Sequence, residues 1–224
     1  MSLHDNSLNM WDRYYASDSG SWFFAKVIHW GREAYFGKLF ARRVRMLGGE
    51  AVSYLELGVG TAQTLTRLQK MTNAPCTGIE KTPRAHELGK LTAPNCTLVL
   101  GDALALPFPE QSFDVIYSLG LFEHFEPEEQ RQLLSEQARV AKKMILIEVP
   151  TKSPHMRSIM WFNRVVRKRK GVWADDELFS QAHFKEKFPG LPFRYYFDWG
   201  SGAMTCWFAL KPEDVKAFLN RPQD

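Results

Sequence analysis

The sequence lacks the marks of a disulfide-stabilised or zinc-bound protein. Its 224 residues include only three cysteines, which are widely spaced and form no C-x-x-C pair: Cys76, Cys96 and Cys206. An odd number of isolated thiols argues against a disulfide framework and against a structural zinc site. We therefore expect no bound metal and a reducing compartment, the cytoplasm.

Long apolar runs and a strong charge imbalance are also missing. No segment approaches the ~20 apolar residues of a membrane-spanning helix, and the N-terminus has no basic start followed by an apolar stretch. The formal net charge is +4, from 29 basic and 25 acidic residues, which is a small excess for a dedicated nucleic-acid binder. The 45% of hydrophobic residues suffices for one large core. We expect a soluble protein with one domain over residues 1–224.

Strand-like and helix-like segments alternate through the middle of the chain. Short apolar segments predict strands, and apolar residues spaced three to four positions apart predict helices between them. This alternation predicts an α/β fold: a Rossmann-like, doubly wound, mostly parallel sheet in a three-layer αβα arrangement. The predicted strands are 52–57, 77–80, 97–100, 113–118 and 143–149, and the predicted helices are 63–71, 83–91 and 127–140.

The segments outside this alternation have patterns of their own. A helical pattern over residues 22–47 ends at Gly48 and Gly49, which stop helices well. Two aromatic-rich segments, 193–199 and 205–210, predict a terminal antiparallel hairpin. We divide the chain into an N-terminal helical cap (1–50), a cofactor-binding core (51–150), an inserted cap after the fifth strand (151–190) and C-terminal strands (191–224).

An acidic residue and two glycines stand where the first predicted strand meets its helix. The segment reads Glu56-Leu-Gly58-Val-Gly60-Thr-Ala62. Glycines here let a ligand approach the backbone, because a Cβ would fill the space that the ligand needs. Such a turn alone is equally consistent with an ordinary strand-to-helix connection. A dinucleotide-binding turn would carry a third glycine at position 63, where this chain has Gln63.

Two carboxylates follow the next two predicted strands. Glu80 ends the second strand, and Asp102 comes directly after the third. The carboxyl ends of parallel strands meet at one edge of the sheet, where α/β proteins bind their ligands. A carboxylate at position 80 can accept hydrogen bonds from both ribose hydroxyls, and one at position 102 can accept from the amino group of adenine. We therefore predict a nucleoside site.

These segments, together with Phe113-Asp-Val-Ile-Tyr-Ser118, resemble in their order the motifs of class I S-adenosylmethionine-dependent methyltransferases of the small-molecule branch. The resemblance covers residues 52–149. It implies that S-adenosyl-L-methionine is the methyl donor and S-adenosyl-L-homocysteine the product. It also implies donor contacts from Glu56, Gly58 and Gly60 (methionine and ribose), Glu80 (ribose), Asp102 and Ala103 (adenine), and Ser118 and Leu119 (the border between donor and substrate).

The sequence constrains the methyl acceptor less than the donor. His124 lies in a Leu-Phe-Glu-His segment that looks like the Leu-x-His stretch of the same branch. Histidine suits a general base at neutral pH, but the pattern favours a local hydrogen-bonding role, which is common for histidine near a helix start. Aromatic residues outside the core, Tyr14, Tyr15 and Trp161, predict walls for a small apolar or aromatic acceptor. Transfer to oxygen, nitrogen or carbon is not distinguished, and neither is the oligomeric state.

Residues 158–170 join an apolar run to five basic residues. Such a segment is consistent with peripheral contact with an anionic membrane and a lipid or quinone acceptor. It is also consistent with a solvated basic helix end, or with nucleic-acid phosphates bound through residues 164–170. The sequence has no Asn-Pro-Pro-Tyr motif, which argues against methylation of nucleic-acid bases. A binding protein without activity is disfavoured, because all the predicted donor carboxylates are present.

Overall fold

A computed structural model describes the backbone of residues 23–166 and 177–221, with side chains from residue 35 onward. The predicted substrate residues Tyr14 and Tyr15 lie outside the described residues. The chain divides at residue 108 into two compact units. No helix in the part of the chain that the structure describes is long and apolar enough to cross a membrane.

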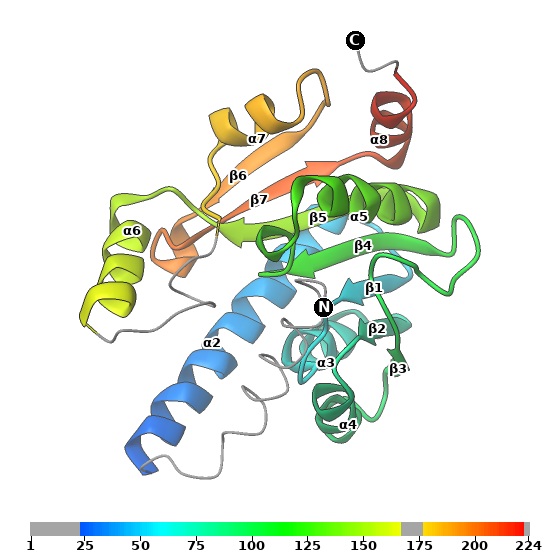
Figure 1. Ribbon diagram of the computed structural model, residues 1–224. Helices are drawn as coiled ribbons and strands as arrows, with labels where there is room; N and C mark the ends of the chain where they lie inside the picture. The colour runs from blue at the N-terminus through cyan, green and yellow to red at the C-terminus, as the bar shows by residue number, and fades with distance from the viewer. Residues whose placement is uncertain (1–22, 167–176, 222–224) are drawn as a thin grey trace. The chain divides into compact units, whose positions relative to one another are not determined.

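The first unit contains three parallel strands in the order β3-β2-β1. Residue Leu55 pairs with Thr77, and Thr77 with Thr97, so that all three strands run in the same direction. Every residue of the first two strands is buried, as expected of parallel strands covered on both faces. The elements are α2 (Phe23–Gly48), β1 (Tyr54–Leu57), α3 (Gln63–Thr72), β2 (Cys76–Glu80), α4 (Pro83–Thr92) and β3 (Thr97–Leu100) (Figure 1).

Helix α2 packs against α3 through small residues. Gly37, Ala41 and Val44 are buried and follow one another at helical spacing. A Cβ at position 37 would lie 3.0 Å from Nη1 of Arg67 on α3. That nitrogen donates a hydrogen bond to the carbonyl oxygen of Gln63 at 2.6 Å. The glycine therefore lets the arginine stem lie directly against α2.

The second unit contains four strands in the order β4-β5-β7-β6. Strands β4 (Phe113–Leu119) and β5 (Ala141–Pro150) are parallel. Strand β7 (Thr205–Leu210) runs antiparallel both to β5 and to β6 (Arg194–Asp198), which confirms the predicted terminal hairpin. The helices are η2 (Phe122–His124), α5 (Pro127–Val140), α6 (Pro154–Trp161), η3 (Phe162–Val166), α7 (Gln181–Lys187), η4 (Trp199–Ser201) and α8 (Pro212–Leu219) (Figure 1).

Helix α8 was not expected from the sequence, which predicted only strands for residues 191–224. The helix starts at Pro212, a favourable first helical residue. It buries Val215 and Phe218 and packs against α5, where the Arg131 guanidinium lies 5.4 Å from the Phe218 ring centre. Eight residues with three buried side chains, Pro212, Val215 and Phe218, give too short a pattern for a periodicity argument.

Phenylalanines from distant segments form the core of the second unit. Phe184 of α7 stacks on Phe208 of β7, with ring centres 4.0 Å apart and an interplanar angle of 16°. Phe122, Phe179 and Phe188 are also buried and contact the same cluster. Part of the segment predicted as an inserted cap, residues 179–188, thus contributes to a hydrophobic core.

Candidate functional site

The turn between β1 and α3 is held in the left-handed backbone region. The φ angles are +63° at Gly58, +53° at Gly60 and +58° at Ala62. Glycine adopts such angles freely, whereas Ala62 does so at a strain of about 1 kcal/mol. Two backbone hydrogen bonds fix the turn: the N–H of Val59 donates to the carbonyl of Ile79 at 3.1 Å, and that of Ala62 to Val59 at 2.9 Å.

Two glycines outside the predicted motif make room for this turn. A Cβ on Gly78 of β2 would lie 2.8 Å from Cγ2 of Val59, and a Cβ on Gly89 of α4 would lie 3.1 Å from the carbonyl oxygen of Gly60. Sequence reasoning missed both residues. An isolated glycine inside a strand is the available signal, because it often marks a close approach of another segment.

Glu80 is tied to the turn by hydrogen bonds. Its Oε2 accepts from the N–H of Gly60 at 2.8 Å, and its Oε1 accepts from the N–H of Thr82 at 2.8 Å. The side chain is buried. Each carboxylate oxygen has a second lone pair, so that hydrogen bonds from two hydroxyls remain possible. This arrangement is compatible with the predicted ribose contact.

Asp102 has a partner that the sequence did not reveal. Its Oδ2 accepts from Nζ of Lys81 at 2.6 Å, and its Oδ1 accepts from the N–H of Leu104 at 3.0 Å. The side chains of Lys81 and Asp102 are each 31% exposed. Lys81 directly follows Glu80 at the carboxyl end of β2. That position is the only feature of the sequence that could have suggested a contact with Asp102. The predicted adenine contacts of Asp102 and of the buried Ala103 stay predictions.

Glu56 is buried in β1 opposite Gly78 of β2, and its charge acts on two nearby thiols. Burial, the neighbouring Cys96 and the Glu56 carboxylate together raise the pKa of Cys76 to about 12. Burial and Glu56 raise the pKa of Cys96 to about 11. Both thiols therefore stay protonated at neutral pH, and neither is a reactive nucleophile. The predicted contact between Glu56 and the donor remains untested.

The second unit holds the other predicted donor residues, Ser118 and Leu119, at the end of β4. Ser118 is buried, and within the described residues its Oγ has no hydrogen-bond partner. Gly120 follows with a φ of +58°, and its N–H donates to the carbonyl of Glu148 at 3.1 Å. The backbone thus leaves the sheet directly after the two predicted residues.

His124 ends the short helix η2, which is held in place by Gln130 of α5. Nε2 of Gln130 donates to the carbonyls of Phe122 and Phe125 at 3.1 and 3.0 Å, and to Oε2 of Glu177 at 3.1 Å. Sequence reasoning missed both Gln130 and Glu177, since they lie 47 residues apart. The contacts fix the backbone around His124, while its role as a base stays a prediction.

Glu177 also accepts hydrogen bonds from two residues of α7. Nζ of Lys187 lies 2.6 Å from its Oε2, and Nε2 of His183 lies 2.8 Å from its Oε1. Burial alone would raise the pKa of Glu177, but the hydrogen bonds from Lys187 and His183 lower it below its ordinary value. The carboxylate is therefore charged at neutral pH, as a structural link between α5 and α7.

A second buried carboxyl group, Glu148 of β5, was also missed. Burial, and to a smaller extent the carboxylate of Asp198, raise its pKa to about 8 against hydrogen bonds that lower it. Asp198 is itself buried and accepts from the N–H of Gly200 at 2.9 Å and from Nε1 of Trp207 at 3.1 Å. The available signal was a single acidic residue inside the apolar run of residues 144–149.

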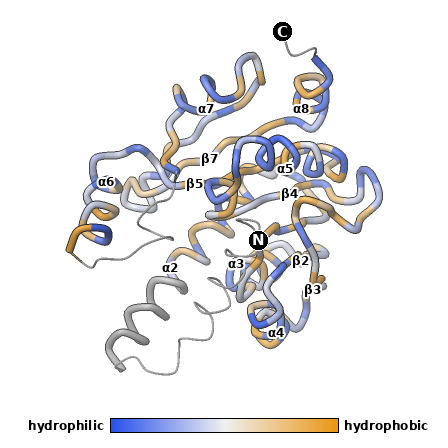
Figure 2. The backbone as a smooth tube through the Cα atoms, in the orientation of Figure 1, coloured by the Kyte–Doolittle hydropathy of each residue, from blue (hydrophilic) through white to orange (hydrophobic). Residues whose placement is uncertain are grey.

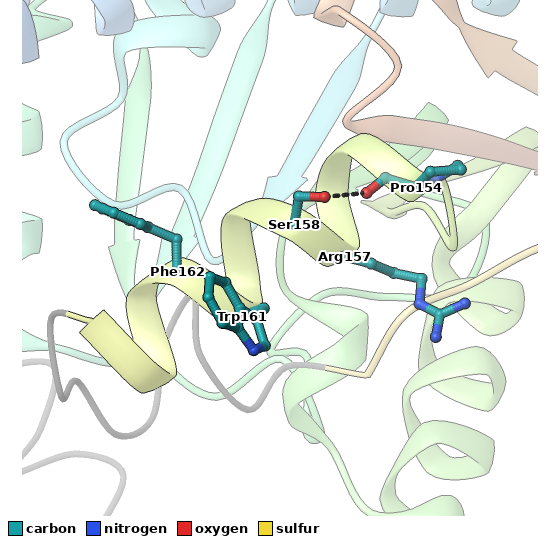
Figure 3. Close-up of a pocket in the computed structure, with 5 residues that line it drawn as sticks. All are labelled: Pro154, Arg157, Ser158, Trp161 and Phe162. Carbon is teal, nitrogen blue, oxygen red and sulfur yellow. Dashed lines mark hydrogen bonds between the residues drawn. The ribbon is translucent and has the colours of Figure 1, made fainter.

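The predicted substrate residue Trp161 lines an open hollow of about 660 Å³ along α6. Figure 3 shows Trp161 and Arg157 projecting from one side of this helix and Phe162 from another. The hydroxyl of Ser158 donates to the carbonyl of Pro154 at 2.9 Å. Its hydrogen is therefore already used within the helix. All residues lining this hollow, Pro154, Arg157, Ser158, Trp161 and Phe162, belong to the second unit.

Residues 55–144 match a family model described as a methyltransferase domain. A probable chloroplastic tocopherol O-methyltransferase of Oryza sativa subsp. japonica is 34% identical over 95 residues, which are 40% of this chain and 26% of that protein. An uncharacterized methyltransferase of Anoxybacillus flavithermus is 33% identical over 89 residues, which are 40% of this chain and 42% of that protein. The chain thus spans less than half the length of either relative.

Solved structures are similar over most of the chain. Magnesium protoporphyrin IX methyltransferase from Synechocystis PCC 6803, solved with S-adenosylhomocysteine, has a TM-score of 0.63 and 14% identity over 92% of this chain and 94% of that one. A possible histamine N-methyltransferase from Thermotoga maritima has a TM-score of 0.62 and 16% identity over 85% and 96%. These similarities confirm the predicted Rossmann-like α/β fold.

The family model, the two sequence relatives and the shared fold agree with the resemblance found in the motifs. Residues 55–144 therefore match a methyltransferase domain, and the chain shares the fold of solved S-adenosylmethionine-dependent methyltransferases.

Proposed function

We propose that the protein transfers a methyl group from S-adenosyl-L-methionine to a small apolar or aromatic acceptor and releases S-adenosyl-L-homocysteine. The observation that carries this proposal is the hydrogen bond between Glu80 and the Gly60 N–H at 2.8 Å. It fixes a buried carboxylate beside a turn whose glycines leave the backbone open to a ligand. A nucleoside with free ribose hydroxyls fits such an acceptor, whereas a 2′-phosphate would be repelled.

In this proposal, residues of the first unit contact different parts of the donor. Glu80 accepts from the ribose hydroxyls, Gly58 and Gly60 border the methionine portion together with Glu56, and Asp102 with Ala103 contacts adenine. When bound, the donor supplies a methyl group on a sulfonium that is already an activated leaving group. The protein then mainly has to orient the acceptor, because orientation alone is worth effective molarities of about 10⁵ to 10⁸ M. Ser118 and Leu119 stay predicted contacts at the end of β4.

The nature of the acceptor is inferred from exposed aromatic surface and from named relatives. Trp161 and Phe162 line an open hollow, and aromatic walls suit a ring-containing acceptor. One relative is named for tocopherol and one structural neighbour for magnesium protoporphyrin IX, and both compounds contain rings. If the acceptor is a hydroxyl that must lose a proton, His124 is the candidate base.

Isothermal titration of the full chain tests donor binding. We expect S-adenosyl-L-methionine and S-adenosyl-L-homocysteine to bind with micromolar dissociation constants, and NADPH, which carries a 2′-phosphate, not to bind. Absence of heat from both sulfur compounds, with protein shown to be folded by circular dichroism, would contradict the proposal.

Transfer from methyl-labelled donor tests the acceptor class. The panel should hold a quinol, a simple phenol, an aromatic amine and a DNA oligonucleotide, with Glu80→Ala protein as the background. We expect label in the organic extract of a ring-containing acceptor, followed by mass spectrometry to identify the methylated atom. Label that appears only in the oligonucleotide would favour the nucleic-acid alternative instead.

A further inference from the structure

Four large apolar side chains are exposed at the end of α6 and in η3. Trp161 is 61% exposed, Phe162 49%, Val165 52% and Val166 54%. Figure 2 shows hydrophobic and hydrophilic residues meeting at this end of the helix. We name these four residues the α6 apolar surface. Single exposed apolar residues are ordinary, but a contiguous group marks a surface that contacts another molecule.

The α6 apolar surface faces away from the fold because the helix is held from its other side. Met156 and Asn163 are buried and lie seven residues apart, which places them on one helix face. Trp161 and Val165, four residues apart, lie on a different face. Ser153 anchors the start of the helix: its Oγ accepts from the N–H of Met156 at 3.1 Å and donates to the carbonyl of Ala203 at 2.6 Å.

The described part of this helical segment carries basic charges only. Residues 154–166 contain Arg157 and Arg164 and no acidic residue. Arg157 and Arg164 are exposed on the same helical segment as the apolar side chains.

We propose that the α6 apolar surface docks on an anionic lipid bilayer. A helix with exposed tryptophan, phenylalanine and valine next to basic side chains lies in the plane of a membrane interface. Phenylalanine and valine side chains enter the acyl boundary, tryptophan sits at headgroup level, and Arg157 and Arg164 are attracted by anionic headgroups. A nucleic acid would satisfy the charges but not the apolar side chains. The α6 apolar surface shares Trp161 and Phe162 with the hollow proposed for the acceptor, which fits an apolar acceptor that arrives from the bilayer. Binding to lipid does not itself depend on methyl transfer.

Sedimentation of the full chain with lipid vesicles tests this proposal. We expect binding to phosphatidylcholine vesicles that contain phosphatidylglycerol, and little binding to pure phosphatidylcholine. Replacing Arg157 and Arg164 by glutamine should lower the partition coefficient about 25-fold, at roughly fivefold per basic residue. Lys142→Gln with Lys185→Gln, two exposed residues of the same unit, makes the same charge change and should leave binding unchanged.

A second pair of variants tests the apolar contribution. Trp161→Ala should lower vesicle binding about tenfold. Leu91→Ala, at an 81% exposed position on α4, should not. Donor affinity measured by calorimetry should be the same in all these variants, so that loss of vesicle binding is separate from loss of donor binding. A protein that fails to bind the donor but sediments as expected would refute the proposed function and leave this proposal supported.

Three results would overturn the proposal. The first is no sedimentation with anionic vesicles, and the second is equal binding to neutral and anionic vesicles. The third is a dimer seen by light scattering that Trp161→Ala converts to monomer, because a second copy of the chain would then cover the surface.

Discussion

Glu80 in the first unit and Glu148 in the second are both buried glutamates near the carboxyl end of a parallel strand, yet their surroundings differ. Each carboxylate oxygen of Glu80 accepts a backbone N–H at 2.8 Å. At Glu148 burial outweighs the hydrogen bonds from Thr205 and from the Gly120 N–H, the negative charge of Asp198 adds to the effect of burial, and the pKa rises to about 8. Two buried glutamates thus differ in role: Glu80 holds the glycine turn through backbone N–H groups, whereas Glu148 keeps a proton inside the sheet.

The largest expected effect concerns the pH dependence of stability. In the folded chain Glu148 keeps its proton up to about pH 8, whereas in the unfolded chain it loses the proton near pH ~4.3. Between these values the unfolded state binds fewer protons, so the free energy of unfolding falls as pH rises, by up to about 1.4 kcal/mol per pH unit. Glu148→Gln removes this loss and should gain about 3 kcal/mol over wild type between pH 6 and pH 9.

Urea unfolding followed by circular dichroism at several pH values measures this gain. Glu186→Gln, at an exposed position on α7, is the matched control and should follow the wild-type profile. Parallel profiles for wild type and Glu148→Gln would mean that Glu148 is not the buried acid inferred here, and the contrast with Glu80 would disappear.

The cysteines allow a test of whether burial raises the pKa of a thiol in both units. Burial and Glu56 raise the pKa of Cys96 to about 11 in the first unit, while burial and Glu148 raise that of Cys206 to about 12 in the second. From a reference value of 9.0, a rise of about two units makes the Cys96 thiolate roughly 100-fold scarcer at pH 8. Alkylation by iodoacetamide should slow by that factor.

Mass spectrometry of the alkylated protein measures this rate for each cysteine. All three thiols should react together once the chain is unfolded in urea. Fast alkylation of Cys206 alone in the folded protein would show that the interior of the second unit is more open than that of the first.

The Glu80 hydrogen bonds lead to a prediction about donor affinity. Glu80→Gln keeps the shape of the side chain, but its amide can offer a carbonyl oxygen to only one of the two N–H groups, from Gly60 and Thr82. The other N–H then meets an amide donor, at a loss of about 1 to 3 kcal/mol. We expect the dissociation constant for S-adenosyl-L-methionine to rise about 5- to 150-fold.

Calorimetric titration measures this change, with Glu87→Gln on α4 as the control because its side chain is exposed. Unchanged affinity in Glu80→Gln would remove Glu80 from the donor site and leave its role as a support for the turn.

The smallest expected effect belongs to the ion pair of the first unit. Lys81→Met removes the partner of Asp102, and both side chains are partly exposed. Such pairs contribute at most about 1 kcal/mol to stability. The free energy of unfolding should therefore change by less than about 1 kcal/mol, and the difference should shrink further at high salt. A larger loss would show that the lysine holds the Asp102 loop in place.

Local sequence patterns were sufficient to predict much of the fold. The predicted bounds 97–100, 127–140 and 205–210 agree with β3, α5 and β7. Helix α5 shows why: Pro127 occupies a favourable first position, and Glu129 accepts from the Glu126 N–H, so that its start is encoded within a few residues.

The missed features have a common physical origin. The contact of Lys81 with Asp102 spans 21 residues and that of Gln130 with Glu177 spans 47. Such pairs leave no repeat in the sequence, because they form only when distant segments pack together. The turn at Gly58 and Gly60 was found because its requirement is local, whereas the state of Glu148 depends on burial that a single sequence does not specify.

Gly78 illustrates a constraint that two positions share. A Cβ added at Gly78 would lie 2.8 Å from Val59, so the residue at position 78 and the residue at position 59 compete for the same space beside the turn at Gly58 and Gly60. Gly78→Ala should destabilise the protein by about 1 to 3 kcal/mol, and Val59→Ala in the same chain should restore part of the loss. In related sequences we expect a larger residue at position 78 only where position 59 has become smaller.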